Sequence, residues 1–176
     1  DSSLSRFKGY KADPSVSIGL RADHPALLES RTLFPTTVVD VSESPRLLVS
    51  GHNNPKLGKR INKGAWSGFE VYHLSLEERA TCPRSCERWS DCFGNAMHRA
   101  RRHNHREPEF LPTLRGELAM LQRQHPKGFA IRLHTLGDFY SYEYVHFWAD
   151  MLDTFDALHV FGYTHRREDA DDFTRG

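Results

Sequence analysis

The chain has 176 residues and a formal net charge of +1, with 38% hydrophobic and 27% charged residues. This length suits one domain with a core of its own, and the composition excludes an intrinsically disordered chain. No apolar run is long enough to span a membrane, and the small net charge provides no global basic field for nucleic acid.

The first part of the chain carries few signals of regular structure. Residues 1–36 are punctuated by proline and glycine, with room for one short helix at residues 26–33. Residues 37–50 hold two β-rich runs around a Ser-Glu-Ser-Pro turn, which predicts a β-hairpin. Residues 51–68 form a basic loop rich in glycine and asparagine. We therefore expect residues 1–68 to be an irregular N-terminal extension.

From residue 69 onward, predicted strands alternate with predicted helices. Alternating polarity and runs of β-forming residues predict strands at 69–76, 129–136 and 158–164. Helices are predicted at 96–103, 108–126 and 142–155, the last capped by Ser141. This order favours right-handed crossovers and a largely parallel sheet. The expected fold class is α/β, with residues 69–176 as the second domain.

Two polar loops follow strands of this predicted sheet. The cysteine segment comes after the strand at 69–76, and the Gly-Asp-Phe-Tyr-Ser segment, residues 137–141, comes after the strand at 129–136. Ligands of parallel sheets bind beyond the carboxyl ends of the strands. We therefore expect both loops on the same rim.

All three cysteines of the chain lie in one loop, as Cys82, Cys86 and Cys92 with the spacing C-x3-C-x5-C. Three thiolates suit a [4Fe–4S] cluster with one iron left open, or a zinc site completed by a histidine. The candidates for that fourth place are His73, His98, His103, His105 and His134. A third interpretation makes the cysteines buried apolar residues, or a disulfide with one cysteine to spare.

Basic residues cluster on both sides of the cysteine loop. Lys56, Lys59 and Arg60 lie in the basic loop, with Trp66 as a stacking platform for bases. Arg99 and Arg102 would share one face of the predicted helix at 96–103 with Arg106. Phosphate contacts are one interpretation of both groups, and solvated surfaces are the other.

The segment around residue 138 contains the candidate catalytic residues. Arg132 and His134 alternate along their strand, and Gly137 and Asp138 follow at its carboxyl end. Asp138 could bind an amine or a hydroxyl, or it could orient His134. It could equally be part of a turn in which its side chain caps the next helix.

The motifs TCPRSC, DCFGN, RLHTLGDFYSYEYVHFW and VFGYT together resemble the phage-encoded gene product 88-like family and its bacterial relatives. That family shares a cysteine cluster, an arginine-bearing helix, an H-x-x-GDFYS-x-x-Y segment and a strand that ends in Tyr-Thr. The resemblance covers about half of the chain and implies no particular reaction.

The order of strand, three-cysteine loop, helix, strand and Gly-acid turn also resembles radical S-adenosylmethionine (SAM) enzymes. That resemblance implies a partial (β/α) parallel sheet, reminiscent of a partial TIM-like barrel. It also implies a [4Fe–4S] cluster on Cys82, Cys86 and Cys92, with SAM gripped at Gly137 and Asp138. The superfamily has C-x3-C-x2-C and Gly-Gly-Glu, and this chain departs from both patterns.

The leading hypothesis is a cytoplasmic iron–sulfur protein, because clustered cysteines without a signal peptide favour a reducing compartment. It would act as a radical SAM-like enzyme on a substrate between the cysteine loop and residues 137–141, with Arg132, His134 and Asp138 binding that substrate. The alternative is a zinc-stabilised nucleic-acid-binding module of phage or mobile-element origin. Its phosphate contacts would be Lys56, Lys59, Arg60, Arg99 and Arg102.

Overall fold

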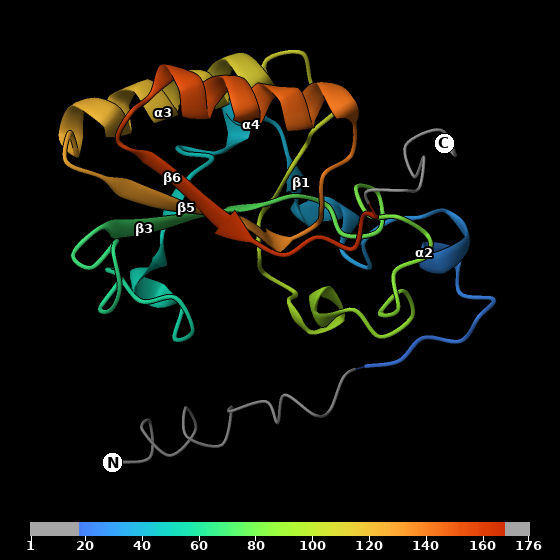
Figure 1. Cartoon of the computed structure of the whole chain (residues 1–176). Helices are drawn as coiled ribbons and strands as arrows, with labels where there is room; N and C mark the ends of the chain where they lie inside the picture. Colours follow the sequence, from blue (N-terminus) through green and yellow to red (C-terminus); the bar gives the residue numbers. More distant parts are fainter. Residues whose placement is uncertain (1–17, 168–176) are drawn as a thin grey trace.

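The computed structural model describes residues 18–167 (Figure 1). The outer parts of both predicted domains, residues 1–17 and 168–176, lie outside the described residues. The helices and strands in chain order are α2 (Pro25–Leu28), β1 (Val38–Val39), β2 (Val49–Ser50), β3 (Glu70–Ser75), β4 (Arg102–His103), α3 (Phe110–Gln124), β5 (Phe129–Leu136), α4 (Tyr142–Thr154) and β6 (Leu158–Gly162). Short 3-10 turns are η1 (Pro35–Thr37), η2 (Val41–Glu43), η3 (Gly51–Asn53) and η4 (Phe93–Ala96).

The fold is α/β, as the alternation of elements predicts. Four strands form a sheet in the order β2-β3-β5-β6, in which β3, β5 and β6 run parallel and β2 is antiparallel at one edge. The sheet does not close into a barrel within the described residues. The three parallel strands therefore end at a common rim, from which the loops after β3, β5 and β6 depart.

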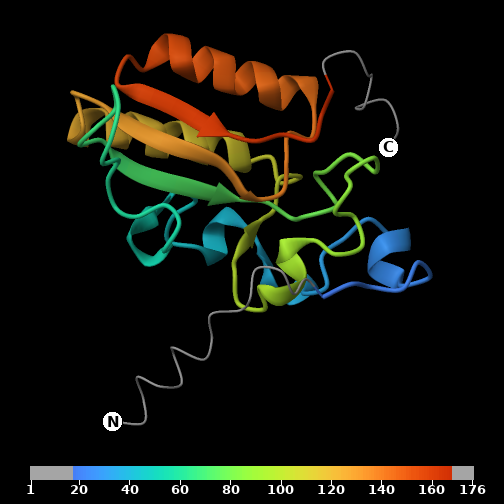
Figure 2. The same cartoon turned by 60° about the horizontal axis from the view of Figure 1, so that its bottom comes forward.

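Helices α3 and α4 lie side by side across one face of this sheet (Figures 1 and 2). Both helices begin and end close to their predicted bounds, because leucine and aromatic side chains recur on their inner sides. Ser141 caps α4 as predicted, since its hydroxyl accepts a hydrogen bond from the Tyr144 amide at 3.1 Å. The buried core between helices and sheet includes Leu114, Leu118, Leu121, Ile131, Leu133, Tyr144, Trp148 and Met151. Across residues 18–167, none of the helices combines the length and apolarity needed to cross a membrane.

The predicted hairpin at residues 37–50 is wrong. Its two runs do not pair with each other: β1 pairs in parallel with β4, and β2 pairs antiparallel with β3. Leu47 and Leu48 reach the main core beside β2. The extension before residue 69 therefore shares the core of the α/β part.

The predicted helix at residues 96–103 is also wrong. The segment begins with the end of η4 and finishes as the short strand β4, whose Arg102 and His103 are both buried. In the predicted helix, Arg102 would lie on a basic face exposed to solvent, whereas the structure buries both Arg102 and His103. The short helix predicted at residues 26–33 forms only over Pro25–Leu28.

The basic loop at residues 51–68 returns the chain toward the sheet. Its Trp66 contacts the rings of His159 and Phe161 on β6, at centroid distances of 4.9 and 6.4 Å. Val71 of β3 and Phe161 border the same depression as Trp66. Trp66 is therefore part of the packing on β6 rather than a free platform for stacking bases.

Candidate functional site: the cysteine loop and the strand-end rim

The cysteine loop and residues 137–141 meet at the rim, as the topology predicts. The Asp138 amide donates to the Thr81 hydroxyl at 3.0 Å, which joins the loop after β5 to the start of the cysteine loop. Arg166, beyond β6, donates to the Phe139 carbonyl at 2.8 Å and to the Thr81 carbonyl at 2.9 Å. Segments from three strand ends thus converge on one place.

Gly137 allows this contact between the two loops. Its φ is +85°, and a Cβ at this position would lie 2.6 Å from the Thr81 hydroxyl and 2.8 Å from the Leu76 Cβ. A side chain here would be strained by both the backbone angle and the crowding. Glycine is therefore required for the close approach of the loops.

Asp138 holds the rim together through its carboxylate. The residue is 1% exposed. One oxygen accepts from the Phe139 amide and the Thr164 hydroxyl, both at 2.7 Å, and the other accepts from the His165 amide at 2.8 Å. Three donors therefore compensate the buried charge. The carboxylate therefore ties the turn to the segment after β6, and the cap of helix α4 is Ser141 rather than Asp138.

Cys82, Cys86 and Cys92 are free thiols of intermediate exposure. The pKa of Cys82 is raised to about 12, mainly by burial and to a smaller extent by the charges of Asp138, Cys92 and Cys86, whereas a hydrogen bond with the Arg79 backbone lowers it. Burial likewise raises the pKa of Cys92, with further increases from the charges of Glu78 and Cys86. Because the pKa of each of the three thiols is raised, all three are protonated near neutral pH.

A set of buried polar residues holds the cysteine loop in place. The sequence pattern did not predict this role for any of them. Arg102 and Glu78 form a fully buried ion pair in which Nε bonds Oε2 at 2.6 Å and Nη2 bonds Oε1 at 3.0 Å. The same guanidinium donates to the carbonyls of Gly94, Met97 and Ala100. The loop after the third cysteine is therefore fastened to the end of β3.

A second buried arginine fastens the other half of the loop. Arg79 donates to the Trp89 carbonyl at 2.8 Å and to the Asn95 side chain at 2.7 Å. A third bond, to the Arg31 carbonyl at 3.3 Å, reaches the segment after α2. The Glu-Glu-Arg run at residues 77–79 is the only sequence signal of these supports, and it does not reveal the partners.

The assignment of Arg102 to phosphate binding is wrong, because its guanidinium is fully buried against Glu78. The other predicted phosphate contacts, Lys56, Lys59, Arg60 and Arg99, have exposed side chains. Arg60 also lies 3.4 Å from the Glu70 carboxylate.

The structure places the three candidate catalytic residues in different surroundings. His134 is 7% exposed and bonds the Tyr144 hydroxyl at 2.7 Å, on the side of the sheet that α4 covers. Burial lowers its pKa to about 3, so the ring is neutral. Arg132 pairs in register with His73 of β3 instead. Neither side chain forms a hydrogen bond with Asp138, whose three partners are given above.

The five candidate fourth ligands have other neighbours. His73 bonds Thr135, His98 packs on Phe34, His105 packs on Tyr140, and His134 bonds Tyr144. The fifth candidate, His103, is a buried residue of β4 that pairs with Val39 of β1. In residues 18–167, no group of three or more histidine, cysteine, aspartate or glutamate side chains could hold a metal ion as placed. The thiols themselves remain a donor set of the type that binds zinc or iron–sulfur clusters.

Comparison with known proteins identifies one family. The family described as gene product 88 matches residues 46–174, which is more than half of the chain. No curated protein and no solved structure matches. The chain therefore belongs to the gene product 88 family, as its motifs predict.

Proposed function

We propose that this member of the gene product 88 family binds an iron–sulfur cluster through Cys82, Cys86 and Cys92. The observation that carries the proposal is the position of three free thiols on one loop at the rim. Repulsion between thiolates that share a small volume is relieved by a bound cationic centre, which keeps them deprotonated. No disulfide uses up any of the three.

The chemistry of the donors favours a cluster over a single zinc ion. Zinc requires four donors about 2.0–2.3 Å from one point, and the three cysteines supply only three of them. In a cluster, each cysteine binds a different iron, so three cysteines suffice when one iron remains open. Such a cluster supplies electron transfer and an open coordination position.

We further propose that the use of this cluster is radical SAM-like. In this proposal, β3, β5 and β6 with α3 and α4 correspond to part of a (β/α) barrel, with the helices outside. Gly137 and Asp138 shape the turn opposite the cysteine loop. Because the Asp138 carboxylate already accepts three hydrogen bonds, its part is to fix the turn beside the cluster.

The loops meet at Thr81, so the proposed substrate lies outward of that contact. The charge of Asp138 contributes to the raised pKa of both Cys82 and Cys86, which supports a common space between the turn and the cysteine loop. A substrate in this space would lie next to an iron that no cysteine binds. Arg132 and His134 lie on β5, which precedes this turn. Both residues stay candidates for positioning the substrate.

Anaerobic purification followed by reconstitution with iron and sulfide tests the proposal. We expect about four irons and four sulfides per chain, with a broad visible absorption and an electron paramagnetic resonance signal after reduction. Single variants Cys82→Ala, Cys86→Ala and Cys92→Ala should lose most of the iron. Ser85→Ala is the matched control, because Ser85 is exposed within the same loop.

A colourless protein that holds one zinc ion per chain would overturn the iron–sulfur assignment. That result would favour the zinc-stabilised alternative. Equal iron content in the cysteine variants and in Ser85→Ala would show that bound iron is adventitious.

A further inference from the structure

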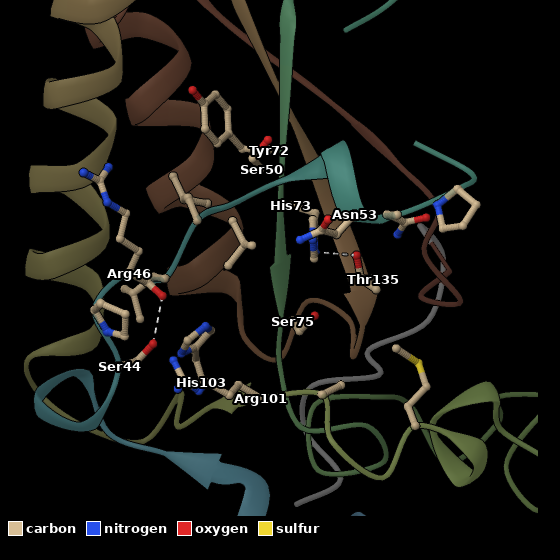
Figure 3. Close-up of a pocket in the computed structure, with 18 residues that line it drawn as sticks. Ser44, Arg46, Ser50, Asn53, Tyr72, His73, Ser75, Arg101, His103 and Thr135 are labelled. Carbon is tan, nitrogen blue, oxygen red and sulfur yellow. Dashed lines mark hydrogen bonds between the residues drawn. The ribbon is translucent and has the colours of Figure 1, made fainter. Parts of the chain in front are cut away.

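A second site lies beside the rim, in a pocket of about 880 Å³ (Figure 3). Residues 44–55, strand β3 and the end of the segment at 97–103 enclose it, with Thr135 of β5 at its inner side. Ser44, His103 and Arg101 lie toward one end, and Ser50 and Tyr72 lie toward the other. The volume falls within the range of pockets that bind small organic molecules.

The lining of this pocket combines apolar surface with positive charge. Its apolar members are Pro45, Leu47, Leu48, Val49, Pro55, Met97 and Ala100. Arg46 and Arg101 also line it and have exposed side chains, whereas none of the 18 lining residues is acidic. Glu117 reaches the backbone of the lining from outside, where its carboxylate accepts from the Leu47 and Leu48 amides. The local field therefore favours an anion.

His103 supplies an unused polar atom in this lining. The residue is 3% exposed, and its ring Nδ1 has no hydrogen-bond partner. Burial and the charge of Arg101 lower its pKa to about 4, so the ring is neutral near pH 7. The ring also bonds the Leu47 backbone. Because a carbonyl can only accept, Nε2 carries the proton and Nδ1 presents a lone pair.

His73 places a second neutral ring at the inner side of the pocket. Its Nδ1 and the Thr135 hydroxyl are 3.0 Å apart, and Figure 3 shows this pair between β3 and β5. Burial lowers the pKa of His73, and the nearby Arg132 lowers it further. The pocket thus offers neutral hydrogen-bonding groups at His73, Thr135 and His103, and the guanidinium of Arg101 lies toward the same end as His103.

We propose that this pocket binds a small organic anion, with an apolar body against Leu48 and Met97 and an acidic group facing Arg101. The acidic group is a phosphate, sulfonate or carboxylate, since guanidinium binds all three through paired hydrogen bonds. A hydroxyl or amine on the body would donate to His103. This inference is independent of the cluster, because no cysteine lines the pocket.

Two fluorescent probes with one aromatic body test the proposal. 1-Anilinonaphthalene-8-sulfonate carries the acidic group, and N-phenyl-1-naphthylamine lacks it. We expect saturable binding of the sulfonate at one site per chain. Arg101→Gln should weaken the sulfonate about tenfold, equivalent to about 1.4 kcal/mol, and should leave the neutral probe unchanged. Arg123→Gln, exposed near the end of α3, should change neither affinity.

A second variant tests whether the probes bind in this pocket, without a change of charge. Ala100→Leu narrows the pocket and should weaken both probes, while circular dichroism shows that the fold is intact. Equal effects of Arg101→Gln and Arg123→Gln would overturn the proposal, as would unchanged binding in Ala100→Leu. Phenyl phosphate should displace the sulfonate probe. Displacement by a single-stranded oligonucleotide at lower concentration would identify the surface as a polyanion site and refute the small-ligand assignment.

Discussion

The buried ion pair between Arg102 and Glu78 gives the most direct test of how the cysteine loop is held. Replacing Arg102 by methionine keeps the approximate volume and removes every hydrogen bond that the guanidinium donates. Both carboxylate oxygens of Glu78 lose their partner, at contacts of 2.6 and 3.0 Å. The Thr32 hydroxyl, at 2.7 Å, then remains as a donor to Glu78.

The magnitude follows from the burial of both side chains, which are 0% exposed. Removing one partner of such a pair costs about 3–5 kcal/mol, because the other charge remains buried without compensation. Domains of this size are stable by about 5–15 kcal/mol. Arg102→Met should therefore remove a large part of the free energy of unfolding.

Urea denaturation followed by circular dichroism measures this loss. Arg106→Met is the matched control, because Arg106 is 61% exposed and lies 3.7 Å from Glu77. An exposed pair of this kind contributes less than about 1 kcal/mol. The double variant Glu78→Gln with Arg102→Met should be more stable than Arg102→Met alone, since no carboxylate charge is then buried. If the Arg102 and Arg106 variants lose equal stability, the reasoning fails.

Two further predictions concern the rim and the histidine behind it. Gly137→Ala should lower stability by about 1–3 kcal/mol in thermal unfolding, because φ is +85° and Thr81 crowds the new Cβ. Gly116→Ala, in open space within α3, should not lower it. The pKa of His134 is about 3 in the folded chain, below the unfolded value of about 6.5. Its contribution is complete above pH 6.5 and declines toward pH 3, so His134→Gln should lessen the loss between pH 7 and 5 by about 2 kcal/mol. His146→Gln, exposed on α4, should keep the wild-type loss, and an unchanged loss in His134→Gln would contradict this reasoning.

Local patterns were sufficient for the three parallel strands and for the two helices that cover them, but not for β2, whose pairing with β3 was not predicted. The strand at residues 129–136 was predicted to the residue, because its signal lies within one run of alternating side chains. Helix α4 was predicted within one residue at its end, since Ser141 marks its start. The shared rim followed from the parallel order of the strands.

The supports of the cysteine loop could not be predicted in the same way. Arg102 belongs to a basic run, and such a run is typical of an exposed surface unless a buried carboxylate is known to face it. Glu78 lies 24 positions earlier in the chain. The pairing of β1 with β4 is equally remote, because two-residue strands carry no pattern of their own. The supports of the cysteine loop therefore depend on contacts between distant parts of the chain, which local periodicity does not reveal.

Residues 18–39 support the cysteine loop, so the structure of this loop depends on a part of the chain that precedes the sheet. Side chains between residues 79 and 95 donate hydrogen bonds to four backbone carbonyls of this segment, those of Ile18, Leu27, Leu28 and Arg31. The family match begins at residue 46, after all of these contacts. A relative that kept only the matched segment would need another scaffold for its thiols. Variation before residue 46 should therefore track the sequence of the cysteine loop more closely than that of the sheet.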